Sequence, residues 1–179
     1  MSLKYLDQYW VNFNGLVDGI HHFEFEINNK FFEFFEASEI KEGTFQIEVV
    51  LHKQPGTLLF EFHLHGSAKV VCDRCLDFFN QPIDQQYKQI VKLGEKNAEI
   101  SEDTMMIPEA EHKINLSQFF YEYIHLSLPV QRIHPTDKKG KSKCNPEMIR
   151  KLEELKAQKE NRSAEIDERW EKLKNIQLN

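Results

Sequence analysis

Apolar and polar residues alternate along much of the chain between residues 21 and 107, which is the pattern of strands with one buried face. The alternation is clearest over 44–53 and 57–65. Gln54-Pro55-Gly56 separates these segments and predicts a tight turn, because proline fixes the first dihedral angle and glycine accepts a positive φ. The two segments are therefore expected to form a hairpin. Further strands are predicted over 21–27, 68–72, 83–93 and 105–107, and a mobile acidic loop over 94–104.

Helical spacing replaces the alternation near Asn115. Apolar residues recur three or four positions apart until Pro129, which cannot continue a helix, so we predict a helix over 115–128 that lies across the sheet. A shorter helix is predicted over 30–37, where the preceding asparagines offer a cap. Pro146 suits the first turn of a charged helical tail, whose thin apolar stripe continues after residue 163.

Together these elements predict an α+β fold: a bent, mostly antiparallel sheet covered by a helix and followed by a charged helical C-terminal tail. Closure of the sheet into a barrel is an alternative that the pattern leaves open. We divide the chain into a β-rich core domain (1–145), which carries a cysteine turn, and the charged helical tail (146–179).

Composition narrows the class of protein. The 179 residues are 40% hydrophobic, with 14 Phe against 7 Gly and 6 Pro, which excludes a disordered or fibrous chain. Apolar runs stop short of the roughly 18 residues that cross a membrane. The first seven residues lack the layout of a secretion signal. We therefore expect a cytoplasmic protein with no membrane partner.

Charge is unevenly distributed behind the formal net charge of −6. Residues 132–162 contain ten Lys or Arg and five Asp or Glu, a balance of +5, whereas the rest of the chain has 13 against 24, a balance of −11. The body is acidic and one arm is basic, which matters more for partners than the total.

Cys72 and Cys75 are spaced so that two thiolates from one turn can hold the same Zn²⁺. A structural zinc site needs four ligands, and His134 and Cys144 lie together in a later loop, so the candidate metal set is Cys72, Cys75, His134 and Cys144. The alternative is a pair of reduced, partly buried turn residues. A thioredoxin-like redox pair is disfavoured because such pairs open a helix, and here both flanks are predicted strands.

Basic side chains in the arm and on the cysteine turn suit phosphate groups of RNA. Arg74 stands at the tip of the turn, where its planar fork can make two parallel hydrogen bonds to phosphate. A solvated loop is the alternative interpretation. The candidate RNA or partner contacts are Arg74, Arg132, Lys138, Lys139, Lys141, Lys143, Arg150 and Lys151.

Motifs of catalysis are missing from the sequence. It contains no phosphate-binding glycine loop, no His-Glu-x-x-His and no nucleophile elbow. Paired carboxylates are frequent, but a chain with 29 acidic residues provides such pairs without catalysis. We therefore expect a protein that is not an enzyme and has no small-molecule substrate.

The chain resembles the YceD family, the large ribosomal RNA subunit accumulation proteins. The resemblance spans roughly residues 15 to 145. It rests on a cysteine turn after a β-rich body, a further strand, an acidic loop, a helix that ends in Leu-Pro, and a histidine and cysteine beyond. Here these are Val70-Val71-Cys72-Asp73-Arg74-Cys75-Leu76, the strand from Ile83, the helix opened by Ile114-Asn115-Leu116 and ended by Leu126-Ser127-Leu128-Pro129-Val130, His134 and Cys144.

This resemblance implies a bacterial, non-catalytic factor that supports accumulation of large-subunit ribosomal RNA by binding that RNA or the assembling subunit. The chain departs from the family pattern by a longer lysine-rich insert between His134 and Cys144, and by its charged helical tail. The alternative is a protein-interaction module whose acidic body binds a basic ribosomal protein without touching RNA.

Overall fold

The computed structural model describes residues 3–136 and 140–162. The chain forms two compact units, which are described separately. The first comprises Met1–Val71 and Phe78–Arg132, and the second comprises Cys72–Asp77 and Ile133–Asn179. Among the described helices, none has both the length and the apolar character needed to cross a membrane.

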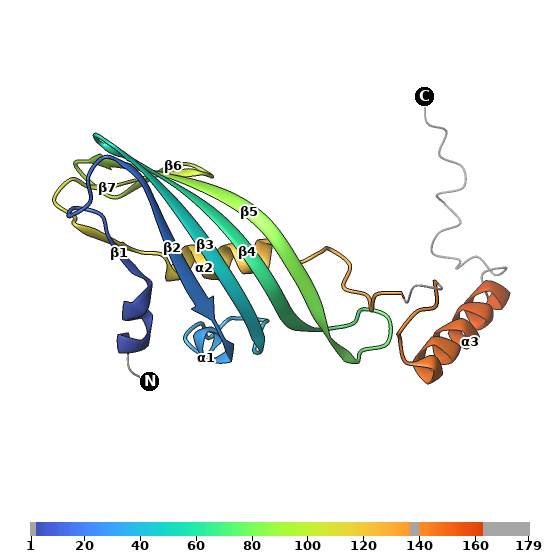
Figure 1. The fold of residues 1–179 in the computed structure, drawn as a ribbon. Helices are drawn as coiled ribbons and strands as arrows, with labels where there is room; N and C mark the ends of the chain where they lie inside the picture. Colours follow the sequence, from blue (N-terminus) through green and yellow to red (C-terminus); the bar gives the residue numbers. More distant parts are fainter. Residues whose placement is uncertain (1–2, 137–139, 163–179) are drawn as a thin grey trace, which may run out of the picture. The chain divides into compact units, whose positions relative to one another are not determined.

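The first unit is built on a six-stranded sheet in the order β2-β3-β4-β5-β7-β6 (Figure 1). Neighbouring strands are antiparallel except β5 and β7, which are parallel. The sheet is open, with β2 and β6 at its edges, so the barrel alternative does not occur. The strands are β2 (Gly19–Ile27), β3 (Gly43–Gln54), β4 (Thr57–Val71), β5 (Phe78–Gly94), β6 (Ala98–Ser101) and β7 (Thr104–Pro108).

Shorter elements complete this unit. A 3-10 helix, η1 (Leu3–Tyr9), leads into β1 (Trp10–Asn12), which pairs with β8 (Lys113–Asn115). Helix α1 (Asn29–Phe32) follows β2, and helix α2 (Ser117–Leu126) lies across one face of the long strands (Figure 1). The second unit contains helix α3 (Pro146–Arg162).

The core lies between α2 and the sheet. Alternate residues of β3 and β4 are buried, as their sequence pattern predicts. Helix α2 contributes Phe120, whose ring centroid is 5.7 Å from that of Tyr9, 5.2 Å from Phe25 and 6.0 Å from Phe62. The predictions of an α+β fold, an antiparallel sheet and a covering helix are therefore confirmed.

Several predicted boundaries are wrong. The strands predicted over 57–65 and 68–72 are one strand, β4, which runs through Gly66. The predicted loop 94–104 contains β6, because Glu99 pairs with Met105 of β7. Helix α1 ends at Phe32 instead of 37, since Phe34 and Phe35 donate to carbonyls only three residues back. The apolar stripe after residue 163 lies outside the described residues.

Candidate metal centre

The cysteine turn, Cys72–Asp77, connects β4 to β5 and closes on itself through backbone hydrogen bonds. The Cys72 N–H donates to the Asp77 carbonyl at 2.9 Å, and the Leu76 N–H donates to the Cys72 carbonyl at 2.9 Å. To close this turn, Leu76 adopts a φ of 63°, in the left-handed region. Such a turn holds the Cys72 and Cys75 sulfur atoms near each other, as a two-ligand metal turn requires.

Leu76 is expected to be a strained residue whose replacement stabilises the turn. Its side chain is 64% exposed, so little apolar burial is lost on its removal. The left-handed conformation costs an L-residue with a Cβ about 1–2 kcal/mol, and glycine avoids most of that cost. Leu76→Gly should therefore raise the free energy of unfolding of the second unit by up to about 1 kcal/mol, after the larger chain entropy of glycine is subtracted. Amide hydrogen exchange within 72–77 measures this, and faster exchange in the variant would contradict it.

The second pair of candidate ligands comes from the segment that precedes α3. Thr136 and Ser142 form an antiparallel bridge, and Gly140 has a φ of 78° within the segment that they enclose. The Ser142 hydroxyl oxygen accepts a hydrogen bond from the Cys144 N–H at 3.1 Å. This local folding brings His134 and Cys144, ten positions apart in sequence, to the same place.

All four candidate ligands converge in the second unit. One ligand atom from each of Cys72, Cys75, His134 and Cys144 lies within 4.8 Å of every other. The Cys72 and Cys144 sulfur atoms are 3.8 Å apart, and the Cys75 sulfur lies 3.4 Å from His134 Nδ1. With Zn–S bonds of about 2.3 Å, two thiolates at adjacent corners of a tetrahedron lie about 3.8 Å apart. The donor set and its spacing therefore fit a tetrahedral zinc ion.

Burial in the second unit points to the same centre. Among its described residues, only the three cysteines are buried, and all three are free thiols. None of the described residues of this unit belongs to the hydrophobic core cluster. A small unit whose described residues form no apolar core usually needs a metal or disulfides for stability. The arrangement can therefore act as the structural centre of its unit.

Electrostatics favour a thiolate at Cys72. Burial raises the pKa of this thiol, but hydrogen bonds from the backbone of Cys75 and Arg74, and then of His134, outweigh it and lower the pKa to about 6. Burial raises the pKa of Cys144, and the Ser142 hydroxyl partly opposes that effect. Metal ligands must be deprotonated, so the amide groups of the turn prepare Cys72 for a cation.

Asn145 is a supporting residue that the sequence analysis missed. Its side-chain oxygen accepts from the Glu147 N–H at 3.1 Å, which caps α3. Its amide nitrogen donates to Asp77 Oδ2 at 3.2 Å, so the residue beside Cys144 is tied to the end of the cysteine turn. The signal was present, because an asparagine immediately before a proline is typical of a helix start.

The predicted RNA contacts are divided between the units. Arg132 belongs to the first unit, where its guanidinium donates to Glu39 Oε2 at 2.8 Å. Lys138 and Lys139 lie outside the described residues. The remaining five are exposed in the second unit: Arg74, Lys141, Lys143, Arg150 and Lys151.

Comparison with protein-family models identifies the family of this chain. A family model described as "Large ribosomal RNA subunit accumulation protein YceD" matches residues 60–177. The chain belongs to the YceD family. The YceD match includes the cysteine turn, His134 and Cys144. Its description names a protein of large-subunit ribosomal RNA accumulation and does not name an enzyme. No curated protein and no solved structure gives a significant match.

The span of the YceD match differs from the expected range of 15 to 145. It begins later, inside β4, and it extends through α3 to residue 177. The expectation that the charged tail is an addition to the family pattern is therefore wrong. The tail and the cysteine turn belong to the same matched region.

Proposed function

We propose that this YceD-family protein is a non-catalytic factor that supports accumulation of large-subunit ribosomal RNA in the cytoplasm, by binding that RNA or the assembling large subunit. The family match over residues 60–177 is the observation that carries the proposal. The uneven charge of the chain supports it, because basic side chains gather in the same region as the candidate metal centre.

The metal centre has a structural role in this proposal. Cys72, Cys75, His134 and Cys144 would hold one Zn²⁺ and fill its tetrahedral coordination. Catalytic zinc sites keep one position open for water or substrate, whereas four protein ligands leave none. The ion would order the loop that carries Lys141 and Lys143, and it would supply no reaction.

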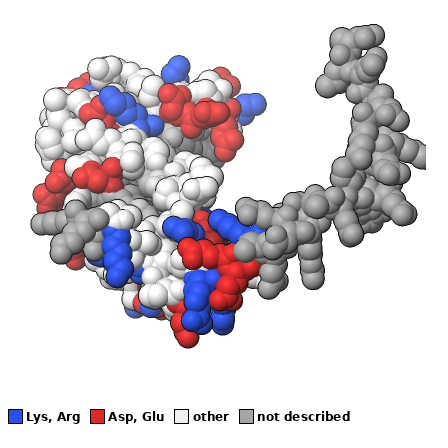
Figure 2. Space-filling view, turned by 90° about the vertical axis from the view of Figure 1, so that its right-hand side faces the viewer, with Lys and Arg blue, Asp and Glu red and all other residues white. Residues whose placement is uncertain are grey.

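RNA contact is assigned to the second unit. Arg74, Lys141 and Lys143 are exposed on the two segments that supply the metal ligands, and Arg150 and Lys151 are exposed on α3. Lysine and arginine neutralise phosphates and release bound counterions, which is the main source of affinity for RNA. Figure 2 shows blue and red side chains interspersed on the face drawn, so the described basic residues on this face do not form a continuous basic field.

Charge reversal tests the RNA assignment. The variant Lys138→Glu/Lys139→Glu/Lys141→Glu/Lys143→Glu should bind ribosomal precursor RNA at least about tenfold more weakly, because it loses up to four phosphate contacts. The magnitude of the slope of log affinity against log salt should fall by up to about 2.8–3.6, given roughly 0.7–0.9 for each of four neutralised phosphates. Filter binding over a salt series measures both quantities.

The matched control reverses four lysines in the first unit, Lys30→Glu/Lys41→Glu/Lys92→Glu/Lys96→Glu, which gives the same change in net charge. We expect its salt slope to match that of the unmodified protein. Equal losses in both variants would show that only the total charge matters. Unchanged co-sedimentation of the Lys138→Glu/Lys139→Glu/Lys141→Glu/Lys143→Glu variant with large-subunit precursors would reject the RNA contact.

A further inference from the structure

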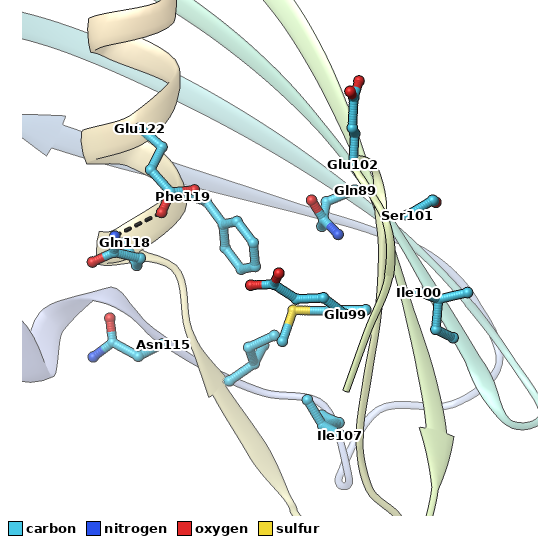
Figure 3. A pocket seen from close by; sticks show the side chains of 12 residues that line it. Gln89, Glu99, Ile100, Ser101, Glu102, Ile107, Asn115, Gln118, Phe119 and Glu122 are labelled. Atoms are coloured by element: carbon cyan, nitrogen blue, oxygen red, sulfur yellow. Dashed lines mark hydrogen bonds between the residues drawn. The ribbon is translucent and has the colours of Figure 1, made fainter. Parts of the chain in front are cut away.

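A groove of about 580 Å³ opens on the first unit, beside α2 and the β6–β7 edge of the sheet (Figure 3). Residues from β5, β6, β7, β8 and α2 line it. Ile107 and Ile114 are almost fully buried, while Met105 and Phe119 are only partly buried and present apolar surface to the groove. A concave surface of this size can receive one or two large apolar side chains.

Carboxylates surround this apolar surface. Glu99, Glu102 and Glu122 are among the twelve lining residues, none of which is lysine or arginine. Figure 3 shows the Glu99 side chain pointing into the groove, toward the side where Gln118 and Glu122 lie. Gln118 donates to Glu122 at 2.6 Å, but among the described residues none of the three glutamates forms a salt bridge.

The acidic groove lies in an acidic unit. The first unit has 10 Lys or Arg against 18 Asp or Glu, a balance of −8. This field repels phosphate groups and attracts cationic side chains, so the groove disfavours nucleic acid and favours a basic partner. An apolar floor beneath acidic side chains is complementary to an amphipathic segment that carries both leucine-like and lysine-like residues.

We propose that this groove binds a basic amphipathic segment of a partner protein. An apolar anchor of the segment packs on Met105, Ile107 and Phe119, and flanking lysine or arginine side chains pair with Glu99 and Glu122. The proposal concerns the first unit, so it stands or falls separately from RNA binding by the second unit. A protein with both sites would hold a basic protein and RNA at the same time.

The test uses the full chain and a fluorescein-labelled helical peptide of about 14 residues with leucines on one face and lysines on the other. Fluorescence anisotropy should show saturable binding. Glu99→Lys/Glu122→Lys should weaken it at least about tenfold, because two attractive charges become repulsive. Phe119→Ala should weaken it about fivefold or more by removing one of the three side chains on which the apolar anchor packs. Peptides with leucine replaced by serine, or lysine by glutamate, should bind far more weakly than the parent.

Glu24→Lys/Glu36→Lys is the matched control, because both glutamates are exposed in the same unit and neither lines the groove. It should retain the affinity of the unmodified protein within about twofold. Equal loss in this control, or equal binding of the serine peptide, would overturn the proposal in favour of nonspecific charge attraction. Thermal melts of each variant confirm that the comparison is made between folded proteins.

Two other occupants give distinct results. If a second copy of the chain fills the groove, sedimentation velocity will show a dimer that Glu99→Lys/Glu122→Lys dissociates. If α3 of the same chain fills it, Leu152→Glu/Leu155→Glu will strengthen peptide binding by exposing the groove. Either result would overturn assignment to a partner protein. The Lys138→Glu/Lys139→Glu/Lys141→Glu/Lys143→Glu variant should bind the peptide with the affinity of the unmodified protein. Failure of the groove proposal is therefore distinguishable from failure of the RNA proposal.

Discussion

The purified protein is expected to contain about one equivalent of Zn²⁺ per chain. Removal of the Zn²⁺ by a chelator is expected to unfold the second unit. The physical reason is that only three of the described residues of this unit are buried, and all three are candidate zinc ligands. Binding of structural zinc contributes roughly 10–16 kcal/mol in small zinc domains, and that energy is folding energy when no preformed site exists. Among the described residues of this unit, no apolar core is available to compensate for loss of the metal.

Cys72→Ser should lower the zinc content of the purified protein below about a fifth of an equivalent, because a serine hydroxyl is a poor substitute for a thiolate. Elemental analysis measures the metal. Limited proteolysis should show rapid cleavage within residues 133–144 in the variant and in chelator-treated protein. The first unit should melt at an unchanged temperature, since its core cluster includes none of the candidate ligands.

Two matched histidine variants distinguish loss of a zinc ligand from a general effect of replacing a histidine. His134→Asn removes a candidate ligand, whereas His112→Asn changes an exposed histidine of the first unit. Only the former should lose zinc. Less than about a tenth of an equivalent in unmodified protein, purified without chelators, would end the zinc proposal. The four residues would then be a cluster of reduced thiols beside a histidine.

Segments with strong local signals were predictable. The β3–β4 hairpin and α2 follow directly from periods of two and near four, because each period reflects burial of one face of one element. The Cys72 and Cys75 part of the candidate ligand set also follows from spacing, because two cysteines three positions apart can share a metal whatever the rest of the fold. These inferences needed no knowledge of distant contacts.

The missed features depend on contacts between distant residues. β1 pairs with β8 through Val11 and Ile114, and both strands are too short to show a period. Arg132, a predicted RNA contact, meets Glu39 across 93 positions, and charge counting gives no sign of that ion pair. The acidic groove draws its lining from five separate elements. No hydrophobic or charge pattern within a single segment predicts these contacts between distant residues.

Gly66 illustrates how a local signal can mislead. The sequence pattern predicts separate strands over 57–65 and 68–72, yet β4 passes through the intervening Gly66 and pairs it with Phe45 of β3. A Cβ at Gly66 would clash with the Thr44 carbonyl oxygen and would lie 2.7 Å from the Cα and from Cδ1 of Phe45. The glycine is therefore required by close approach of backbone and ring, and not by a turn.

Gly66→Ala is expected to destabilise the first unit by about 1–3 kcal/mol or more, because the added methyl group meets backbone atoms that cannot move without breaking the β3–β4 pairing. For a unit of this size, that corresponds to a fall in melting temperature of roughly 3–12 °C. Calorimetry of the full chain measures it, and zinc content should be unchanged because Gly66 lies outside the second unit.

Gly15→Ala is the matched control, since nothing lies within 4 Å of its added Cβ and its φ is not in the positive region. It should change the free energy of unfolding by less than about 0.5 kcal/mol. If both variants melt at the temperature of the unmodified protein, β3 and β4 are not packed as closely at this position as the structure shows. If only Gly66→Ala is destabilised, the continuous pairing of β4 with β3 depends on the lack of a side chain at this one position.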